Sequence, residues 1–198
     1  MQYNLSEITE LIRNRRSIAP ENYTDRQVHQ EQVELLLNNA IWAPNHGMTQ
    51  PWRFVVFANE SKNRLKDAMV EAMTQGVDPM DINPAVLDRM QMRVNKASVA
   101  IAICLHRDPA AKVPEWEEVA AMGAAVQNLH LTAEAYGLAG FWATPGVIYK
   151  ASFQEFLGLD ENTTCKGIFY LGYPVVQEYK SHRKPLEYVT KWHWGNEE

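Results

Sequence analysis

Cysteine is scarce in this sequence, and positive charge is not in excess. The 198 residues include only two cysteines, Cys104 and Cys165, and no C-x-x-C pair. Isolated thiols fit a reducing compartment, so we expect a cytoplasmic protein in which both cysteines are buried and unpaired.

The 19 Lys and Arg against 24 Asp and Glu give a net charge of −5, and no basic run is present. We therefore expect no nucleic-acid partner.

Long apolar runs are also missing. No stretch approaches the length needed to span a bilayer, so we expect no membrane partner. The first twenty residues mix acidic residues with arginines around no apolar core, and no secretory signal is predicted. A composition that is 46% hydrophobic and 22% charged is typical of a globular protein. The length favours a single domain over residues 1–198.

The familiar catalytic motifs are absent as well. The sequence contains no G-x-S-x-G, no H-E-x-x-H and no P-loop, so neither a catalytic side chain nor a metal site is predicted. No G-x-G-x-x-G follows a predicted strand, which argues against a Rossmann enzyme that uses NAD or FAD. FMN lacks the adenylate half of FAD and does not require that fold.

A polar loop, residues 43–52, lies between a predicted helix and a predicted strand. Pro44 and Pro51 prevent a continuous helix or central strand there. A capping-box pattern at Thr24 and Gln27 predicts the start of the preceding helix, whose apolar positions recur at helical spacing up to Ile41. The run 53–57 predicts a buried strand. The polar groups of the loop are thus held between two regular elements and can face a ligand.

The rest of the chain alternates between helical and extended patterns. Asn4 predicts the cap of a short amphipathic helix. Further helices are expected over 60–75, 85–95, 119–136 and 153–157, and strands over 97–104, from 141, and over 166–173. The strand 97–104 is apolar throughout, which predicts a central position covered on both faces. Residues 76–84 read as a loop or lid edge, and the helix 119–136, apolar on most sides, is expected at a subunit interface.

Two basic clusters lie far apart in the sequence. Arg15, Arg16 and Ser17 follow the first predicted helix, and a second basic segment runs from Lys180 to Pro185. Guanidinium groups with a hydroxyl could clamp a phosphate, because arginine matches phosphate oxygens with two hydrogen bonds. Taken alone, the first cluster is more often a solvated helix end that complements the helix dipole.

Four segments follow one another along the chain: Arg15-Arg16-Ser17, the loop 43–52 that ends in Q-P-W, residues 140–144, and residues 183–187, which begin with Arg183. In this order they resemble the nitroreductase family of FMN-dependent oxidoreductases, especially its short members. The resemblance covers residues 11–189, and 76–114 contribute least. It implies an α+β fold with a central mixed or antiparallel sheet flanked by helices. It also implies an intertwined homodimer with a long central helix at the interface.

The resemblance assigns the phosphate side of an FMN site. Arg15, Arg16 and Ser17 match the family's R-R-S element, which contacts the FMN phosphate and ribityl chain. Arg183 resembles the late basic residue that closes the phosphate site. On this assignment two distant basic elements meet on one dianion.

The resemblance also assigns the ring side of the site. The loop before Q-P-W binds FMN across the dimer interface in the family, so Asn45 and His46 would contact a flavin held mainly by the other subunit. A single histidine is otherwise usually a surface or core residue. Trp142, Ala143 and Thr144 match the segment at the isoalloxazine ring, where a backbone N–H lies near N5.

Two positions depart from the family pattern. Trp42 stands where many short members have arginine, and Met48 stands where longer members often have asparagine. We expect contacts with the cofactor to differ at both positions. Trp42 either stacks at the edge of the flavin or belongs to the core of the interface.

The implied activity is that of an FMN-dependent NAD(P)H oxidoreductase. By ping-pong chemistry, a hydride from NADH or NADPH reaches flavin N5, and the electrons pass to a small-molecule acceptor such as a nitroaromatic or a quinone. Two alternatives remain. The chain could be a flavin-binding carrier, sensor or partner protein without catalysis. It could also be an α/β domain whose arginine cluster is a solvated helix end and whose tryptophans fill the core.

Overall fold

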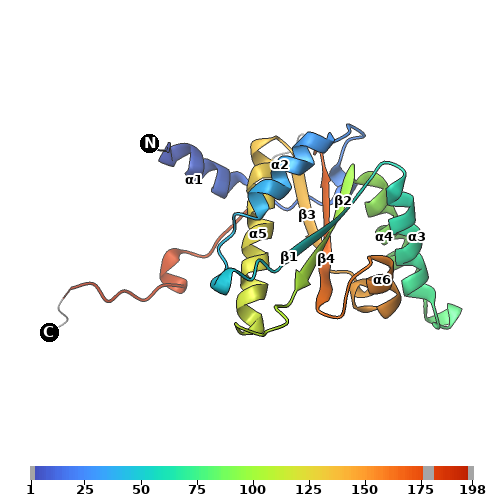
Figure 1. The fold of residues 1–198 in the computed structure, drawn as a ribbon. Coiled ribbons are helices and arrows are strands. Elements are labelled where there is room, and N and C mark those ends of the chain that lie inside the picture. Colours follow the sequence, from blue (N-terminus) through green and yellow to red (C-terminus); the bar gives the residue numbers. More distant parts are fainter. Residues whose placement is uncertain (1–2, 176–180, 196–198) are drawn as a thin grey trace.

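The centre of the protein is a four-stranded sheet (Figure 1). The computed structural model describes residues 3–175 and 181–195. The strands lie in the order β1-β2-β4-β3, with bounds β1 Trp52–Ala58, β2 Val99–His106, β3 Ala139–Ala143 and β4 Thr163–Gly172. Every strand pair is antiparallel, and an isolated bridge between Ser17 and Gly140 adds one parallel contact. The predicted α+β class is confirmed, and of the two sheet types expected the antiparallel one is found.

Helices cover both faces of this sheet (Figure 1). One face packs against α2 (Gln30–Ala40) and α5 (Glu115–Ala135). The other packs against α3 (Ser61–Thr74), α4 (Pro84–Lys96) and α6 (Ala151–Phe156). Because side chains alternate along a strand, β2 supplies residues to both cores and is buried over seven of its eight positions. The expected central strand is thus confirmed.

The remaining helical elements are short or lie outside these layers. Helix α1 (Leu5–Asn14) has no buried residue. Single 3₁₀ turns complete the chain: η1 Pro20–Asn22, η2 His46–Met48, η3 Pro79–Asp81, η4 Gly146–Tyr149 and η5 Leu186–Tyr188. Figure 1 shows α1 and the segment from η5 onward projecting from the same side of the body, where α2 and α5 lie. Neither α1 nor η5 has a buried residue, so within the described residues both elements expose most of their surface.

One of the two predicted helix starts is wrong. Asn4 caps α1 as expected, because its Oδ1 accepts hydrogen bonds from the N–H groups of Ser6 and Glu7. Thr24 and Gln27 do not begin a helix, and α2 starts at Gln30. The N–H and hydroxyl groups of Thr24 both donate to the carbonyl of Tyr173, beyond the end of β4. This tertiary pairing holds the segment extended and overrides the local pattern.

The strand predicted over 53–57 forms, but it is only partly buried: Phe57 belongs to the core, whereas other positions face solvent. It belongs to β1 at the edge of the sheet, where β2 is its single neighbouring strand in the described part of the chain. Arg53 is exposed and Val56 keeps 40% of its surface accessible. The compact aromatic and β-branched run resembled a central strand. The pattern of apolar residues does not show how many strands pair with a given strand.

The two cysteines behave as predicted. Cys104 and Cys165 are free and buried, and they face each other across β2 and β4. A hydrogen bond between the two thiols, and then burial, raises the pKa of the Cys104 thiol. Among the helices of residues 3–175 and 181–195, none is long and apolar enough to cross a membrane.

Gly167 provides a first test of the fold. Its φ is +150°, and a Cβ added there would overlap Trp142 Nε1 and lie 2.7 Å from the Ala143 carbonyl oxygen. Gly167→Ala should therefore lower the free energy of unfolding by about 3 kcal/mol, because the Trp142 ring must move and the backbone is strained. Urea denaturation measures the effect. Gly146→Ala is the control, since no heavy atom lies within 4 Å of its added Cβ. Equal stabilities for the two variants would contradict this account.

Candidate functional site

Arg15 and Arg16 follow α1 directly, but their guanidinium groups have different surroundings. Arg16 Nη1 donates to the carbonyl oxygens of Arg13 at 2.5 Å and of Arg15 at 2.7 Å. Arg16 thus stabilises the carbonyl end of α1, as the dipole interpretation predicted. Arg15 is partly buried, and its Nε has no hydrogen-bond partner within the described residues. Of the two arginines, Arg15 is therefore the one whose guanidinium still requires an acceptor.

The charges of the two distant basic segments meet at Arg15. Burial lowers the pKa of Arg15, the positive charge of Arg16 lowers it further, the carboxylate of Glu134 opposes this, and Arg183 adds a smaller lowering effect. Arg183 is exposed, and its Nη1 donates to the hydroxyl of Ser181 and to the carbonyl of His182. Lys180, the first residue of the predicted basic segment, lies outside the described residues. The structure thus brings Arg15, Arg16 and Arg183 into one positive region.

This positive region lies at the free edge of β3. Ser17 bridges Gly140, and the Ile18 N–H donates to the Gly140 carbonyl at 3.2 Å. The segment after α1 therefore runs beside β3, on the side that no strand of residues 3–175 and 181–195 occupies. Ser17 itself is exposed. A ligand whose anionic end meets Arg15 could extend along this edge.

Trp142, Ala143 and Thr144 form the end of β3 and the turn after it. The indole of Trp142 crosses to the neighbouring strand, because Gly167 on β4 has no side chain to exclude it. Its Nε1 is buried without a hydrogen-bond partner among the described residues. Ala143 is half-buried and Thr144 is exposed. A contact from this segment to a ligand at the free edge must therefore involve groups other than the Trp142 ring, such as the backbone near Thr144.

The loop that contains Asn45 and His46 is organised by its own contacts. Asn45 Oδ1 accepts from the Gln50 N–H at 3.1 Å, and His46 Nδ1 lies 2.6 Å from Glu117 Oε2. Met48 and Gln50 have positive φ values of 54° and 44°, which are strained for residues other than glycine. The loop is therefore a defined, strained structure with an exposed histidine at its tip.

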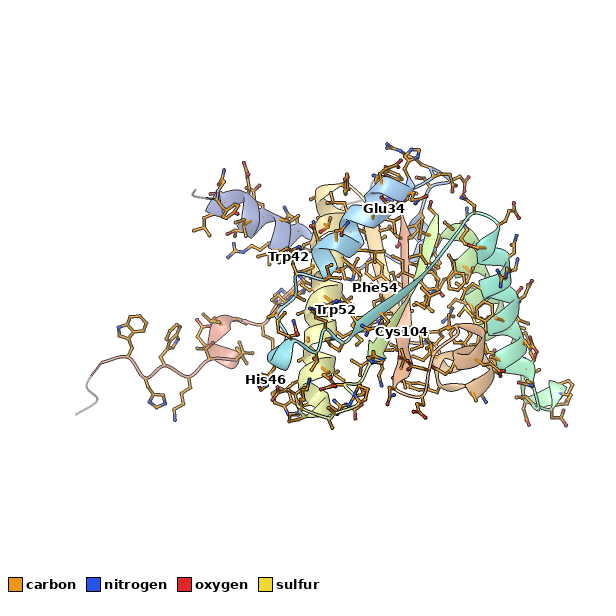
Figure 2. All side chains as sticks on the ribbon, viewed as in Figure 1. Glu34, Trp42, His46, Trp52, Phe54 and Cys104 are labelled. Carbon is orange, nitrogen blue, oxygen red and sulfur yellow. The ribbon has the colours of Figure 1, made fainter. Side chains whose placement is uncertain are left out.

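The structure does not bring this loop to the arginine cluster within one chain. His46 is held by Glu117 near the start of α5, whereas the carboxylate that acts on Arg15 is that of Glu134, near the end of α5. These positions are 134 − 117 = 17 residues apart, and a helix rises about 1.5 Å per residue, so they are about 25 Å apart along α5. In Figure 2, His46 lies toward the lower, N-terminal end of α5, and α1 lies toward its upper end.

The comparisons with known proteins agree with this architecture. A family model described as "Nitroreductase family" matches residues 12–173. The chain belongs to the nitroreductase family. Within it, a relative from Archaeoglobus fulgidus, provisionally named NADH dehydrogenase/NAD(P)H nitroreductase, is 34% identical over 173 residues, which are 86% of this chain and 87% of the relative. The YdjA protein of Escherichia coli K12, provisionally named an NAD(P)H nitroreductase, is 28% identical over 89% of this chain and 93% of its own.

Solved members of the nitroreductase family share the fold along nearly the whole chain. The nitroreductase-like family protein from Bacillus cereus superposes with a TM-score of 0.81 at 28% identity, covering 98% of this chain and 99% of its own. A Desulfovibrio desulfuricans protein, provisionally called a nitroreductase, was solved in complex with FMN. It superposes with a TM-score of 0.72 at 30% identity, covering 97% of this chain and 98% of its own. The family expected from the four ordered segments is thereby confirmed.

The donor groups at the edge of β3 fit an FMN molecule. Three buried nitrogens lack a hydrogen-bond partner within residues 3–175 and 181–195: Arg15 Nε, His130 Nδ1 and Trp142 Nε1. An unpaired buried donor costs about 1–3 kcal/mol, so Arg15 Nε marks a place where a polar ligand would be stabilising, whereas the Trp142 nitrogen lies over Gly167 of β4. Arg15 and Arg183 suit a phosphate, and the Ser17 hydroxyl suits a ribityl chain. FMN bound through these groups would lie along β3.

Sequence reasoning missed His130. It is 7% exposed on α5, its ring packs edge-on against Phe169 at 4.7 Å between ring centres, and its Nδ1 is 3.0 Å from the position of a Gly140 Cβ. A histidine four residues after Val126, within an apolar stripe, was the signal that could have revealed it. The missed residue contacts the same strand as Ser17 and is a neighbour of the proposed cofactor position.

His130 also predicts a pH dependence of stability. Burial first, and then the charge of Arg15, lower its pKa from 6.5 to about 4. Because the unfolded chain binds this proton at higher pH than the folded one does, stability falls as the pH drops from about 6.5 to about 4. A difference of 2.5 pH units corresponds to about 3 kcal/mol. Urea denaturation at pH 7 and pH 4 should show a smaller acid-induced loss for His130→Gln than for the wild type. The same loss in both proteins would contradict this assignment.

Proposed function

We propose that the protein is an FMN-dependent NAD(P)H oxidoreductase. The observation that carries the proposal is the partly buried Arg15 side chain, whose Nε has no hydrogen-bond partner within the described residues and which lies in a positive region with Arg16 and Arg183 at the edge of β3. A dianionic phosphate is the ligand that such a region favours. The FMN-containing Desulfovibrio desulfuricans relative and the NAD(P)H nitroreductase names of other relatives support the same cofactor and electron donor.

The proposed residue roles follow this geometry. Arg15 and Arg183 hold the phosphate, Arg16 and Ser17 fix the turn beside it, and the end of β3 from Trp142 to Thr144 lies under the ring. Bound FMN would supply the redox chemistry, accepting a hydride from NADH or NADPH and returning two electrons to a nitroaromatic or quinone acceptor in a second half-reaction. The protein provides binding and orientation, and no side chain is required as a dedicated acid or base.

We also propose that the working form is a homodimer of this single-domain chain in the cytoplasm. Large apolar side chains are exposed on α1, on the outer face of α5 and along the C-terminal segment, where Tyr188 is 75%, Val189 73% and Trp194 87% exposed. Monomeric proteins rarely expose so much apolar surface in one region. An apolar groove between α1, α2 and α5, lined by Leu11, Leu35 and Tyr136, lies on the same side.

The dimer explains why the loop and the arginine cluster are far apart in one chain. In a two-fold arrangement, Asn45 and His46 of one protomer would reach the flavin held by Arg15 of the other. The strained loop, with its positive φ values at Met48 and Gln50, would then be shaped for a partner's cofactor. Trp42 and Met48 are 84% and 71% exposed in the monomer, which favours interface positions for both.

A flavin carrier or sensor is the alternative, and one experiment separates it from an enzyme. NADPH and NADH are added anaerobically to the purified yellow protein while the visible flavin absorbance is recorded. Bleaching by a reduced nicotinamide, followed by recovery when a nitroaromatic or quinone is added, is expected for the oxidoreductase. Bleaching by dithionite alone would overturn the proposed enzyme and support the carrier.

A further inference from the structure

The tip of the loop 43–52 is joined to the first turn of α5 by a contact between two side chains. His46 Nδ1 lies 2.6 Å from Glu117 Oε2, and the side chains keep 69% and 23% of their surfaces exposed. The other ring nitrogen, Nε2, makes no hydrogen bond within residues 3–175 and 181–195. One nitrogen of the ring is thus held by α5, and the other remains available to a ligand.

The position of Glu117 is fixed from inside the protein. The next residue, Glu118, is 1% exposed, and its carboxylate accepts a hydrogen bond from Arg107, which directly follows β2. Successive residues are about 100° apart around a helix, so a buried Glu118 turns Glu117 toward the surface. The loop packs against the segment before α5, because a Cβ added at Gly47 would lie 3.4 Å from Val113 Cγ1. Packing therefore supports the contact between the loop and α5.

The carboxylate decides which nitrogen of the His46 ring carries the proton. An ionised carboxylate can only accept a hydrogen bond, so Nδ1 must donate to Glu117. In a neutral ring the other nitrogen, Nε2, is then unprotonated and acts as an acceptor. Without Glu117 the proton could occupy either nitrogen, and the ring could present either a donor or an acceptor.

Asn45, the preceding residue, is also held by one of its polar atoms. Its Oδ1 accepts from the Gln50 N–H at 3.1 Å, whereas its NH₂ group makes no hydrogen bond in the part of the chain that the structure describes. With Glu117 in place, the loop presents a donor on Asn45 and an acceptor on His46. FMN carries groups of both kinds, since its ring carbonyls accept and its ring N–H and ribityl hydroxyls donate.

We infer that Glu117 is a positioning residue of the cofactor site. It holds His46 in the form protonated on Nδ1, so that Nε2 accepts a hydrogen bond from a donor group of the flavin bound to the other protomer. The inference rests on the proposed function, which places His46 against that flavin. Glu117 itself contacts no cofactor, and its effect passes through the histidine ring. It lies outside the four segments marked by the sequence.

The first test observes the protonation of the ring. In the full-length protein with ¹⁵N-labelled histidine, with and without FMN, ¹H–¹⁵N NMR correlations distinguish protonated from unprotonated ring nitrogens. At about pH 8.5, where a histidine is ordinarily neutral, we expect the wild-type His46 ring to be protonated on Nδ1. In Glu117→Ala the form protonated on Nε2 should appear.

Glu115→Ala is the matched control for this variant. Glu115 is exposed in the same helical turn and makes no ion pair within the described residues. Its replacement removes the same charge from the start of α5 but leaves the carboxylate beside His46. The protonation of the His46 ring should therefore match that of the wild type.

The second test measures FMN affinity in a double-mutant cycle. Glu117→Ala should weaken FMN binding about fivefold, which corresponds to the loss of one hydrogen bond, and Glu115→Ala by less than about twofold. Quenching of flavin fluorescence by the apoprotein measures both. In the His46→Ala background, Glu117→Ala should have no further effect, because the two residues act through one ring.

Three results would overturn the inference. They are a wild-type His46 ring protonated on Nε2, a Glu117→Ala variant that binds FMN as tightly as the wild type, and effects of Glu117→Ala and His46→Ala that add in full. Each can occur while the protein still binds and uses FMN, so the proposed function would stand. A protein that takes up no FMN would instead overturn the proposed function, and with it the role of Glu117 at the cofactor.

Discussion

Replacing Arg15 with glutamine should weaken FMN binding by about a hundredfold. This is the largest effect on FMN affinity that we expect from a single substitution. Glutamine keeps a polar side chain of similar length but removes the charge that faces the phosphate. Hydrogen bonds to charged groups contribute about 1.5–3 kcal/mol each, and a phosphate contact by arginine uses two of them. Titration of the apoprotein with FMN, followed by quenching of flavin fluorescence, measures the dissociation constant.

The control for this experiment is Arg13→Gln. Arg13 also lies in the last turn of α1 and is exposed, so its loss removes one charge from the same region without removing a buried donor. We expect its effect on FMN affinity to be less than about fivefold, as for other solvent-exposed charges. Equal effects of the two variants would leave the solvated helix end as the better description of the arginine cluster.

Replacing two exposed isoleucines of α1 with aspartate should dissociate the dimer. Ile8 and Ile12 lie four residues apart on one side of this helix, and 41% and 53% of their surfaces are exposed in the monomer. Burying an isoleucine contributes about 2 kcal/mol, and a two-fold interface would contain four of them. Ile8→Asp with Ile12→Asp should therefore weaken the dimer by at least about a thousandfold, as measured by analytical ultracentrifugation over a range of concentrations.

Loss of the dimer should also release the flavin. Asn45 and His46 would then contact no cofactor, and the arginine side of the site would hold FMN alone. Ser6→Asp, on the exposed first turn of the same helix, is the matched control and should leave the dimer intact, because a negative charge near a helix N-terminus is favourable. An isoleucine double variant that stays dimeric would exclude α1 from the interface.

Much of the fold could be predicted from residue patterns because local signals agreed with tertiary contacts. The Asn4 cap, the fully apolar β2 and the long α5 all formed as expected. The failures have tertiary causes. Thr24 pairs with the end of β4 and starts no helix, and the 53–57 run became an edge strand because the sequence cannot show how many strands lie beside it.

The candidate site was predictable where motifs pointed to it and hidden where the fold assembled it. The order of the four segments led to Arg15 and Arg183, and the structure places both in one positive region. The order of the segments could not distinguish Arg15 from Arg16, whose guanidinium donates to the carbonyls at the end of α1. His130 belongs to no motif, and it meets Gly140 on β3 only through the packing of α5 against the sheet.

Sedimentation velocity of the purified protein, recorded simultaneously through protein absorbance and visible flavin absorbance, tests whether two protomers share the cofactor site. We expect a single boundary in both signals, at the mass of two 22.7 kDa chains, with one FMN for each chain. Flavin that sediments with a monomer, or a colourless protein that takes up no added FMN, would contradict a cofactor site shared between two protomers.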